Sequence, residues 1–84
     1  MSDVLDVIAE EARANRTVVI EGRKKDGTEE SREIEPYSIR GGKEDDVLVF
    51  FCLKRQGTRS LLISNILAAE PTGNSFEPRY EVEL

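Results

Sequence analysis

The chain has 84 residues and a formal net charge of −5, which describes one small acidic domain. Its acidity argues against a protein that binds duplex DNA through a basic stripe. Because it contains no histidine and only one cysteine, it excludes Ser-His-Asp and Cys-His catalytic sites and an internal disulfide, and we expect no transition-metal site. We therefore expect a protein that is not an enzyme and that needs no cofactor.

The N-terminal segment predicts an amphipathic helix over residues 2–15. Leu5, Ile8, Ala9 and Ala12 recur with helical spacing, and we expect this stripe to lie on a sheet or to close one mouth of a barrel. The segment lacks the continuous apolar stretch of a signal peptide, and no run approaches the ~20 apolar residues of a membrane span. A cytoplasmic location without membrane contact is the simplest expectation.

Two stretches around the dipeptide Asp26-Gly27 predict the first β-hairpin. Residues 17–24 begin with four β-forming side chains, and residues 29–39 form the return strand. A turn centred on this dipeptide places opposite charges across from each other, which favours this register. The predicted pairs are Lys24 with Glu29, Arg23 with Glu30, Glu21 with Arg32, and the apolar pair Val19 with Ile34. Pro36 cannot donate to a ladder, so it marks an edge, a bulge or a bend.

Residues 46–66 predict the second hairpin, with a two-residue turn at Gln56-Gly57. This turn sets Lys54 opposite Arg59 and Phe50 opposite Ile63. Alternation then gives two apolar faces. The face expected in the core carries Leu48, Phe50, Cys52, Leu61 and Ile63. The other carries Val47, Val49, Phe51, Leu53, Leu62 and Ile66, and it requires a helix, a sheet edge or a partner chain to cover it.

The remaining residues complete a single α+β domain over residues 1–84. A polar loop is expected at residues 41–46, a short fifth strand at residues 67–70, and a turn at residues 70–74. The tail, residues 76–84, alternates and predicts either an added edge strand or a loosely ordered end. We expect the N-terminal helix to be followed by a small five-stranded antiparallel β-barrel of the Sm or SH3 type over residues 17–71.

Two motifs resemble those of the WYL domain, an Sm-like module found mostly in bacterial transcription regulators. The first is Arg-x-hydrophobic-x-Pro at residues 32–36, and the second is Arg-x-Phe-Arg-x-Asp-Arg-Ile, of which residues 59–66 keep the first Arg and the last Ile. The resemblance spans roughly residues 5 to 70. Its Trp-Tyr-Leu signature falls on Asp46-Val47-Leu48, and its second and third Arg fall on Leu62 and Asn65. The Tyr that ends the family's first strand falls on Gly22.

The resemblance implies a ligand-sensing or regulatory module whose Arg and Tyr positions line a pocket for nucleotides or nucleic acid. No helix-turn-helix precedes the module here, so we expect a stand-alone WYL-like domain. Arg59 is the leading ligand-binding candidate because the predicted register sets it against Lys54, and two facing cations favour a bridging anion. We expect Arg32 to approach them if the barrel closes. An internal salt bridge from Arg59 to one of the many glutamates is the structural alternative.

A second functional hypothesis remains open. The apolar face with Val49, Phe51 and Leu53, together with the C-terminal strand, suits a protein–protein or self-association domain with no small-molecule ligand. The partners expected from the sequence are therefore a nucleotide or single-stranded nucleic acid, or else a second copy or another protein. An Sm-type RNA chaperone is disfavoured by the acidic charge.

The charge yields a direct prediction about duplex DNA. The protein should bind a labelled duplex with a dissociation constant of about 10⁻⁴ M or weaker at physiological salt, because it lacks the cations needed to release counterions. Fluorescence anisotropy across a range of salt concentrations measures this. A sub-micromolar complex with a steep salt dependence would contradict the interpretation.

Overall fold

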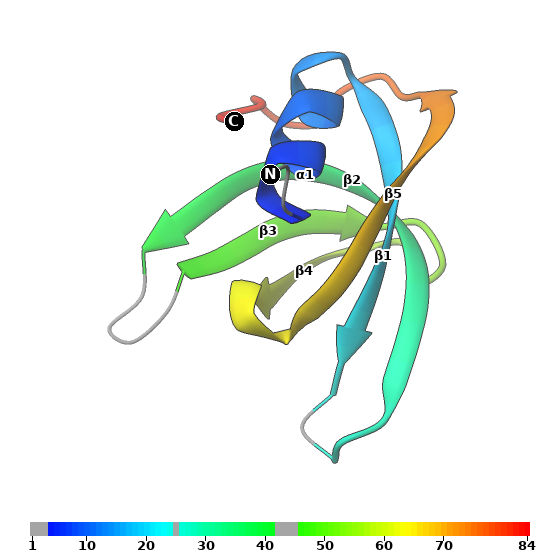
Figure 1. Cartoon of the computed structure of the whole chain (residues 1–84). Helices are drawn as coiled ribbons and strands as arrows, with labels where there is room; N and C mark the ends of the chain where they lie inside the picture. The colour runs from blue at the N-terminus through cyan, green and yellow to red at the C-terminus, as the bar shows by residue number, and fades with distance from the viewer. Residues whose placement is uncertain (1–3, 25, 42–45) are drawn as a thin grey trace.

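The structure, a computed structural model, describes residues 4–24, 26–41 and 46–84 and confirms the α+β class (Figure 1). One helix, α1 (Val4–Arg13), precedes five strands and one short 3₁₀ turn. These are β1 (Arg16–Arg23), β2 (Glu29–Gly41), β3 (Asp46–Cys52), β4 (Gly57–Leu62), η1 (Ile63–Asn65) and β5 (Ile66–Ser75). Residues 2 and 3 of the predicted helix and residues 42–45 of the predicted loop lie outside the described ranges. No helix within those ranges is long and apolar enough to span a membrane.

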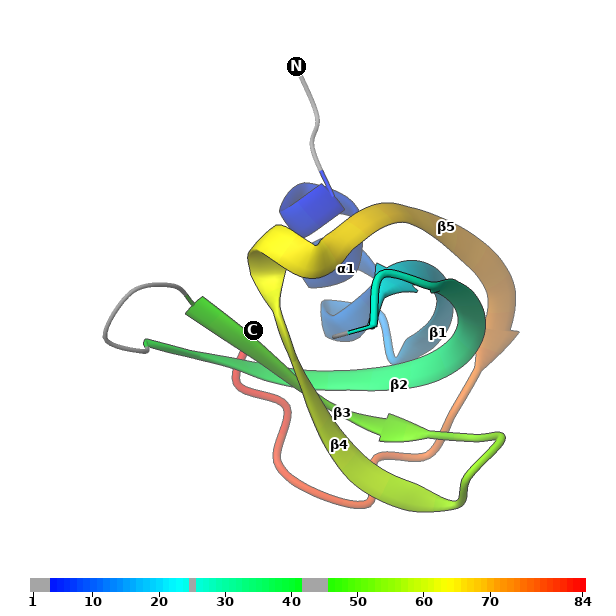
Figure 2. The same ribbon diagram turned by 90° about the horizontal axis from the view of Figure 1, so that it is seen from below.

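The five strands form one antiparallel sheet in the order β4-β3-β2-β1-β5. The sheet bends strongly, so that β5 arches back over its interior (Figure 2). Within the described residues β4 and β5 are edge strands that do not pair with each other. The sheet is therefore not closed, and the predicted barrel is not confirmed.

The core lies between the concave face of the sheet and α1, which packs against β5, β1 and β2. Ile8 and Ala12 of the helix are fully buried, as their spacing predicted. The helix ends at Arg13, and Asn15 follows it with a left-handed φ of 56°. The buried apolar cluster consists of Ile8, Val18, Ile20, Ile34, Leu48, Phe50, Cys52 and Ile66.

The predicted register of the first hairpin is wrong by one residue. Val18, not Val19, lies opposite Ile34, and Arg23 lies opposite Glu29. The predicted register would have set Ile34 beside Val19, on the opposite face of the strand from the buried Val18 and Ile20. The free energy gained by burying these apolar side chains together exceeds the contribution of exposed charge pairs, which is small.

The turn of this hairpin agrees with the observed register. The amide of Lys24 donates to the carbonyl of Thr28 at 2.8 Å, and the amide of Gly27 donates to the Lys24 carbonyl at 3.0 Å. Gly27 has a φ of 90°, which favours glycine. The carboxylate of Asp26 accepts hydrogen bonds from the hydroxyl and the amide of Thr28, and these bonds lower the pKa of Asp26.

The second hairpin keeps the predicted faces of β3 and β4 but not its predicted pairs. The prediction that Ile66 lies on the other face is wrong, since this residue lies in the buried core cluster. Phe50 lies opposite Arg59 rather than Ile63, because the turn is longer than two residues. Gln56 adopts a φ of 53° there, and its side-chain amide donates to the carbonyl of Leu53 at 2.6 Å. The shift is four residues, an even number, so the alternation of faces survives. Lys54 lies in the turn, and its predicted pairing with Arg59 is wrong.

The predicted core of this hairpin is confirmed in part. Phe50 and Cys52 are each 1% exposed, and Leu48 is fully buried. Leu61 and Ile63 are only half-buried, although both pack against the core cluster. Their expected complete burial is therefore wrong, since β4 is an edge strand with no neighbour on its other side.

The C-terminal segment, residues 76–84, covers the part of the second apolar face around Phe51. This segment, which is neither an edge strand nor a helix, runs beneath β2 and β3 (Figure 2). The guanidinium of Arg79 lies 4.0 Å from the centre of the Phe51 ring. The ring of Tyr37 meets Phe76 and Tyr80 edge to face, at centroid distances of 5.8 and 5.2 Å. The strand before it, β5, reaches Ser75 and is longer than predicted.

A buried carboxylate fixes this segment in place. Glu35 is 3% exposed, and it accepts a hydrogen bond from the Tyr37 hydroxyl at 2.7 Å and one from Arg79 Nε at 3.1 Å. The amide of Arg79 donates to the same Tyr37 oxygen at 2.9 Å. Burial, aided by the hydrogen bond to Glu35, raises the pKa of Tyr37 to about 12. The buried charge therefore has the partner it requires, and the segment supplies that partner.

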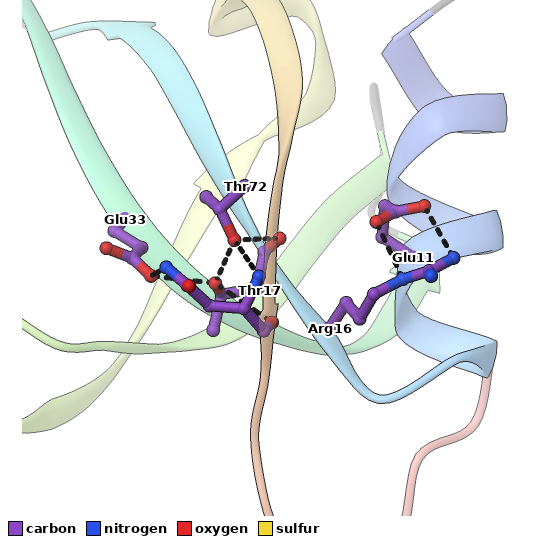
Figure 3. A network of polar contacts seen from close by, with 6 residues as sticks. Glu11, Arg16, Thr17, Glu33 and Thr72 are labelled. Atoms are coloured by element: carbon purple, nitrogen blue, oxygen red, sulfur yellow. Dashed lines mark hydrogen bonds and ion pairs between the residues drawn. The ribbon is translucent and has the colours of Figure 1, made fainter.

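A second polar network joins β1 to its two neighbouring strands (Figure 3). The hydroxyl of Thr17 donates to a carboxylate oxygen of Glu33 on β2 at 2.7 Å and lies 2.6 Å from the hydroxyl of Thr72 on β5. Nearby, Arg16 Nε lies 3.1 Å from Oε1 of the buried Glu11, which ties the start of β1 to α1. These contacts join the start of β1 to β2 and β5 on either side and to the helix.

The buried ring of Phe50 at the centre of the core leads to a prediction about stability. Phe50→Ala should lower the free energy of unfolding by about 3–5 kcal/mol, because it removes a fully buried ring and leaves a cavity. The matched control is Leu62→Ala on the neighbouring strand, where the side chain is 42% exposed and the loss should be about 0.5 kcal/mol. Urea unfolding of both variants measures the difference. Equal stability of the two variants would show that the core is misplaced.

Candidate functional site

Three cations from three parts of the chain meet at one carboxylate. Lys24 Nζ, at the end of β1, lies 2.6 Å from Glu30 Oε2, and an Arg32 guanidinium nitrogen lies 2.9 Å from the same oxygen. Lys54 Nζ, in the turn between β3 and β4, lies 3.9 Å from Glu30 Oε1. The structure thus brings together two of the predicted site residues, Arg32 and Lys54. Both meet at Glu30, which the predicted register had paired with Arg23.

The cations around Glu30 strongly favour the charged form of its carboxylate. The hydrogen bond from Lys24, helped by the nearby charge of Arg32, lowers the pKa of Glu30 to about 2. Three cations around one carboxylate leave a local excess of positive charge on a protein whose net charge is −5. This end of the molecule can therefore attract an anion although the protein as a whole is acidic.

Arg59, the leading candidate from the sequence, stands apart from the cluster. It lies on β4 opposite Phe50 and is exposed to solvent. No described residue forms an ion pair or a hydrogen bond with its side chain, so the predicted internal salt bridge is not present in the described part of the chain. Arg59 is consequently available to a ligand, but Lys54 is not opposite it.

A cavity of about 380 Å³ opens beside the cluster, between the end of β1 and the edge strand β4. It exists because the sheet does not close here, so side chains rather than a strand ladder line the gap. The lining residues are Arg23, Lys24, Val47, Ser60, Leu61, Leu62 and Asn65. The cavity combines the cations Arg23, the last residue of β1, and Lys24, which follows it, with apolar side chains from β3 and β4. Among these lining residues there is no carboxylate or thiol that could act as a general base or nucleophile.

Gly22 lets the two walls of the cavity meet. A β-carbon on Gly22 would lie 2.8 Å from Leu61 Cδ2, which is closer than real side chains approach. Leu61 therefore packs over the backbone of β1 and forms the floor of the cavity. The resemblance assigns Gly22 to a family Tyr, so in this chain the leucine of β4 occupies space that a ring at that position would need.

Arg23 and Lys24 are the functional candidates that sequence reasoning missed. The predicted register placed both in cross-strand ion pairs of the first hairpin, and its one-residue error concealed their place at the cavity. The run of three cations at residues 23–25 was the available signal. Arg23 is exposed, and no described residue forms an ion pair with it. Among the described residues, no group of histidine, cysteine and carboxylate side chains is arranged to hold a metal ion.

The cavity coincides with the positions at which the family resemblance predicts ligand contacts. Val47 falls on the Tyr of the Trp-Tyr-Leu signature, and Leu62 and Asn65 fall on the second and third Arg of the later motif. All three line the cavity. In this chain the positive charge comes instead from Arg23 and Lys24 on the facing strand, so the cavity keeps two cations although the family arginines are replaced.

Comparisons with known proteins show the fold and the family of the chain. The fold resembles a solved structure, proteasome accessory factor B/C (PafBC) of Arthrobacter aurescens, with a TM-score of 0.79 and 15% sequence identity. The similarity covers 87% of this chain and 12% of that chain, and at this identity it establishes a shared fold. No curated protein sequence matches the chain. The family model of the WYL domain matches residues 3–71. Since this match includes most of the sequence, the chain belongs to the WYL domain family.

Proposed function

We propose that this chain is a non-enzymatic regulatory module that binds a nucleotide or a short single-stranded nucleic acid in the cavity between β1 and β4. The observation that carries the proposal is the pairing of Arg23 and Lys24 with an apolar floor at the family's ligand-contact positions. A volume of about 380 Å³ lies within the range of small-ligand sites in proteins.

The chemistry of the cavity matches the two parts of a nucleotide. Arg23 and Lys24 supply donors for phosphate oxygens, and a guanidinium can engage two of them at once. Leu61, Leu62 and Val47 offer the apolar contact that the face of a base requires. A base that is already paired and stacked in a duplex does not present this face. The cavity therefore favours single-stranded or monomeric ligands.

Arg59 extends the site along β4. It lies two residues before Leu61 on the same side of the strand, so the two side chains are about 7 Å apart along the edge. An unpaired arginine at this distance from the floor can reach the next phosphate of a longer ligand. Lys54 and Arg32 act less directly, because neither lines the cavity. Glu30 holds both of them, as it holds Lys24, and keeps the cationic end assembled.

The self-association hypothesis loses its main support. It required the face with Val49 and Phe51 to be open, and the C-terminal segment covers Phe51, which is 7% exposed. The nucleotide-binding proposal needs no such uncovering, because the cavity beside β4 already opens to solvent.

A titration with defined ligands tests the proposal. Adenosine monophosphate and a four-nucleotide single strand should shift the amide resonances of Arg23, Ser60 and Asn65, with the longer ligand binding more tightly and adding Arg59. Arg23→Ala should weaken binding by about tenfold with little loss of stability, since the side chain has no described partner. Arg59→Ala should weaken only the longer ligand.

The matched control is Arg13→Ala, which removes the same charge from an exposed side chain at the end of α1, beside the start of β1 and not its Arg23 end. It should leave nucleotide binding unchanged. Equal weakening of binding by Arg13→Ala and Arg23→Ala would show that only the net charge matters. An absence of shifts with both ligands would refute the proposal.

The Glu30 cluster predicts a pH dependence whose sign follows from its cations. The Glu30 carboxyl should titrate at about pH 2 in carbon-detected NMR, below its ordinary 4.5. Because the folded-state pKa is depressed, its contribution to stability is fully present above pH 4.5 and declines as the pH falls toward 2. Lys24→Gln should move the Glu30 pKa back toward 4.5. In Glu30→Gln, urea unfolding should depend less steeply on pH over this interval, and an unchanged slope would contradict the assignment.

A further inference from the structure

The charges around Glu30 do not balance one another. Lys24, Arg32 and Lys54 approach its carboxylate at 2.6, 2.9 and 3.9 Å, and none of the three forms an ion pair with any other carboxylate of the described residues. We call these four residues the Glu30 cluster. Three positive charges face one negative charge in it, so the cluster has an excess of about +2.

The two lysines of the cluster keep donors for a ligand. An ammonium group carries three N–H donors, of which Lys24 directs one to Glu30 at 2.6 Å. The Nζ atom of Lys54 lies 3.9 Å from the same carboxylate, which is beyond hydrogen-bond distance. The two lysine side chains are 45% and 73% exposed, so a solute reaches both. Lys54 can therefore turn to a ligand without losing a hydrogen bond to any described residue.

Lys24 joins the Glu30 cluster to the cavity beside β4, because it belongs to the cluster and also lines the cavity. Arg23 lines the same cavity and forms no ion pair with Glu29, the residue opposite it on β2. The carboxylate of Asp26, which also lies in the field of Lys24, is hydrogen-bonded within its own turn. An anion that reaches Lys24 from the cavity thus meets Arg23 and the excess positive charge of the cluster.

The charge and the donors match a phosphate monoester better than a phosphodiester. A terminal phosphate carries about −1.5 to −2 charges at neutral pH and offers three strong acceptor oxygens. It cancels the excess of the cluster, and its oxygens can accept charge-assisted hydrogen bonds from Arg23, Lys24 and Lys54 together. A phosphodiester inside a strand carries about one charge, which leaves about half of the excess uncompensated.

We infer that the Glu30 cluster binds a terminal phosphate monoester, so that the module recognises a mononucleotide or the phosphorylated end of a single strand. The inference rests on the proposed function, since the base of the same nucleotide lies in the cavity beside β4. Glu30 is a positioning residue here, because it holds Lys24 and Arg32 in place. Lys54 is the residue that favours an end phosphate over an internal one.

Strands that differ in their ends test the inference. Isothermal titration compares four-nucleotide strands that carry a 5′-phosphate, a 3′-phosphate or no end phosphate. At least one phosphorylated strand should bind about tenfold more tightly than the unphosphorylated strand, and the two arms show which end is recognised. The amide resonance of Lys54 should shift further with that strand. A six-nucleotide strand without an end phosphate has about the same total charge and should bind at least about fivefold more weakly.

Variants of the turn between β3 and β4 assign the preference to Lys54. Lys54→Gln should reduce the ratio of the two affinities, with and without the end phosphate, from about tenfold to about threefold or less. Lys54→Arg keeps the charge and should keep most of the ratio. Arg55→Gln is the matched control, because it removes the same charge from the next exposed residue, which has no ion pair with any described residue. It should keep the parent ratio.

The outcomes separate this inference from the proposed function. Equal affinity for strands with and without an end phosphate would overturn the inference and leave nucleotide binding in place. The same holds if the six-nucleotide strand binds as tightly as the phosphorylated one, or if Lys54→Gln and Arg55→Gln change the ratio equally. An absence of binding by every strand and by adenosine monophosphate would overturn both. Parent-like nitrogen–proton spectra away from each substitution show that the variants fold.

Discussion

The burial of Ile34 at the middle of β2 is the contact on which the rest of the structure depends. It lies opposite Val18 of β1 and opposite Cys52 of β3, so one fully buried side chain fixes the registers of two strand pairs, β1–β2 and β2–β3. Because strand side chains alternate, pointing Ile34 inward turns Glu33 and Glu35 outward. Each then meets a polar partner from a distant part of the chain, Thr17 for Glu33 and Arg79 for Glu35. A slip of one residue would break both polar contacts together with the core.

The same strand separates two chemically different surfaces. At its beginning, Glu30 gathers cations from β1, from β2 and from the turn after β3, beside the gap left by the open sheet edge. Past its bulge, Tyr37 and Ser38 face the C-terminal segment on the outer side. An acidic chain therefore presents one local cationic end, and part of its convex face is covered by residues that follow the family's matched region. Charge distribution rather than net charge decides where an anion can bind.

The candidate site was only partly visible in the sequence. The resemblance pointed to the positions of Val47, Leu62 and Asn65, and these do line a cavity. Arg59 was chosen because the predicted register set it against Lys54 and because it keeps the family's arginine; its role stays a prediction. Arg23 was missed because an arginine in a strand pairs as readily with a cross-strand glutamate as with a ligand, and only the register distinguishes the two. Side-chain spacing along the chain carries no information about a gap between strands that do not pair.

The sequence by itself determined the local elements and the side on which each strand is buried. The helical stripe of Ile8 and Ala12 and the inward Phe50 follow from periodicity alone, since a helix or strand imposes its own repeat on side chains. The registers, the unclosed sheet and the path of residues 76–84 were decided by the tertiary structure. Charge pairing favoured one register of the first hairpin by a small margin, whereas packing of Val18 against Ile34 favours another by more. Such a comparison requires the whole core, because the free energy of burying a side chain depends on neighbours that are distant in the sequence.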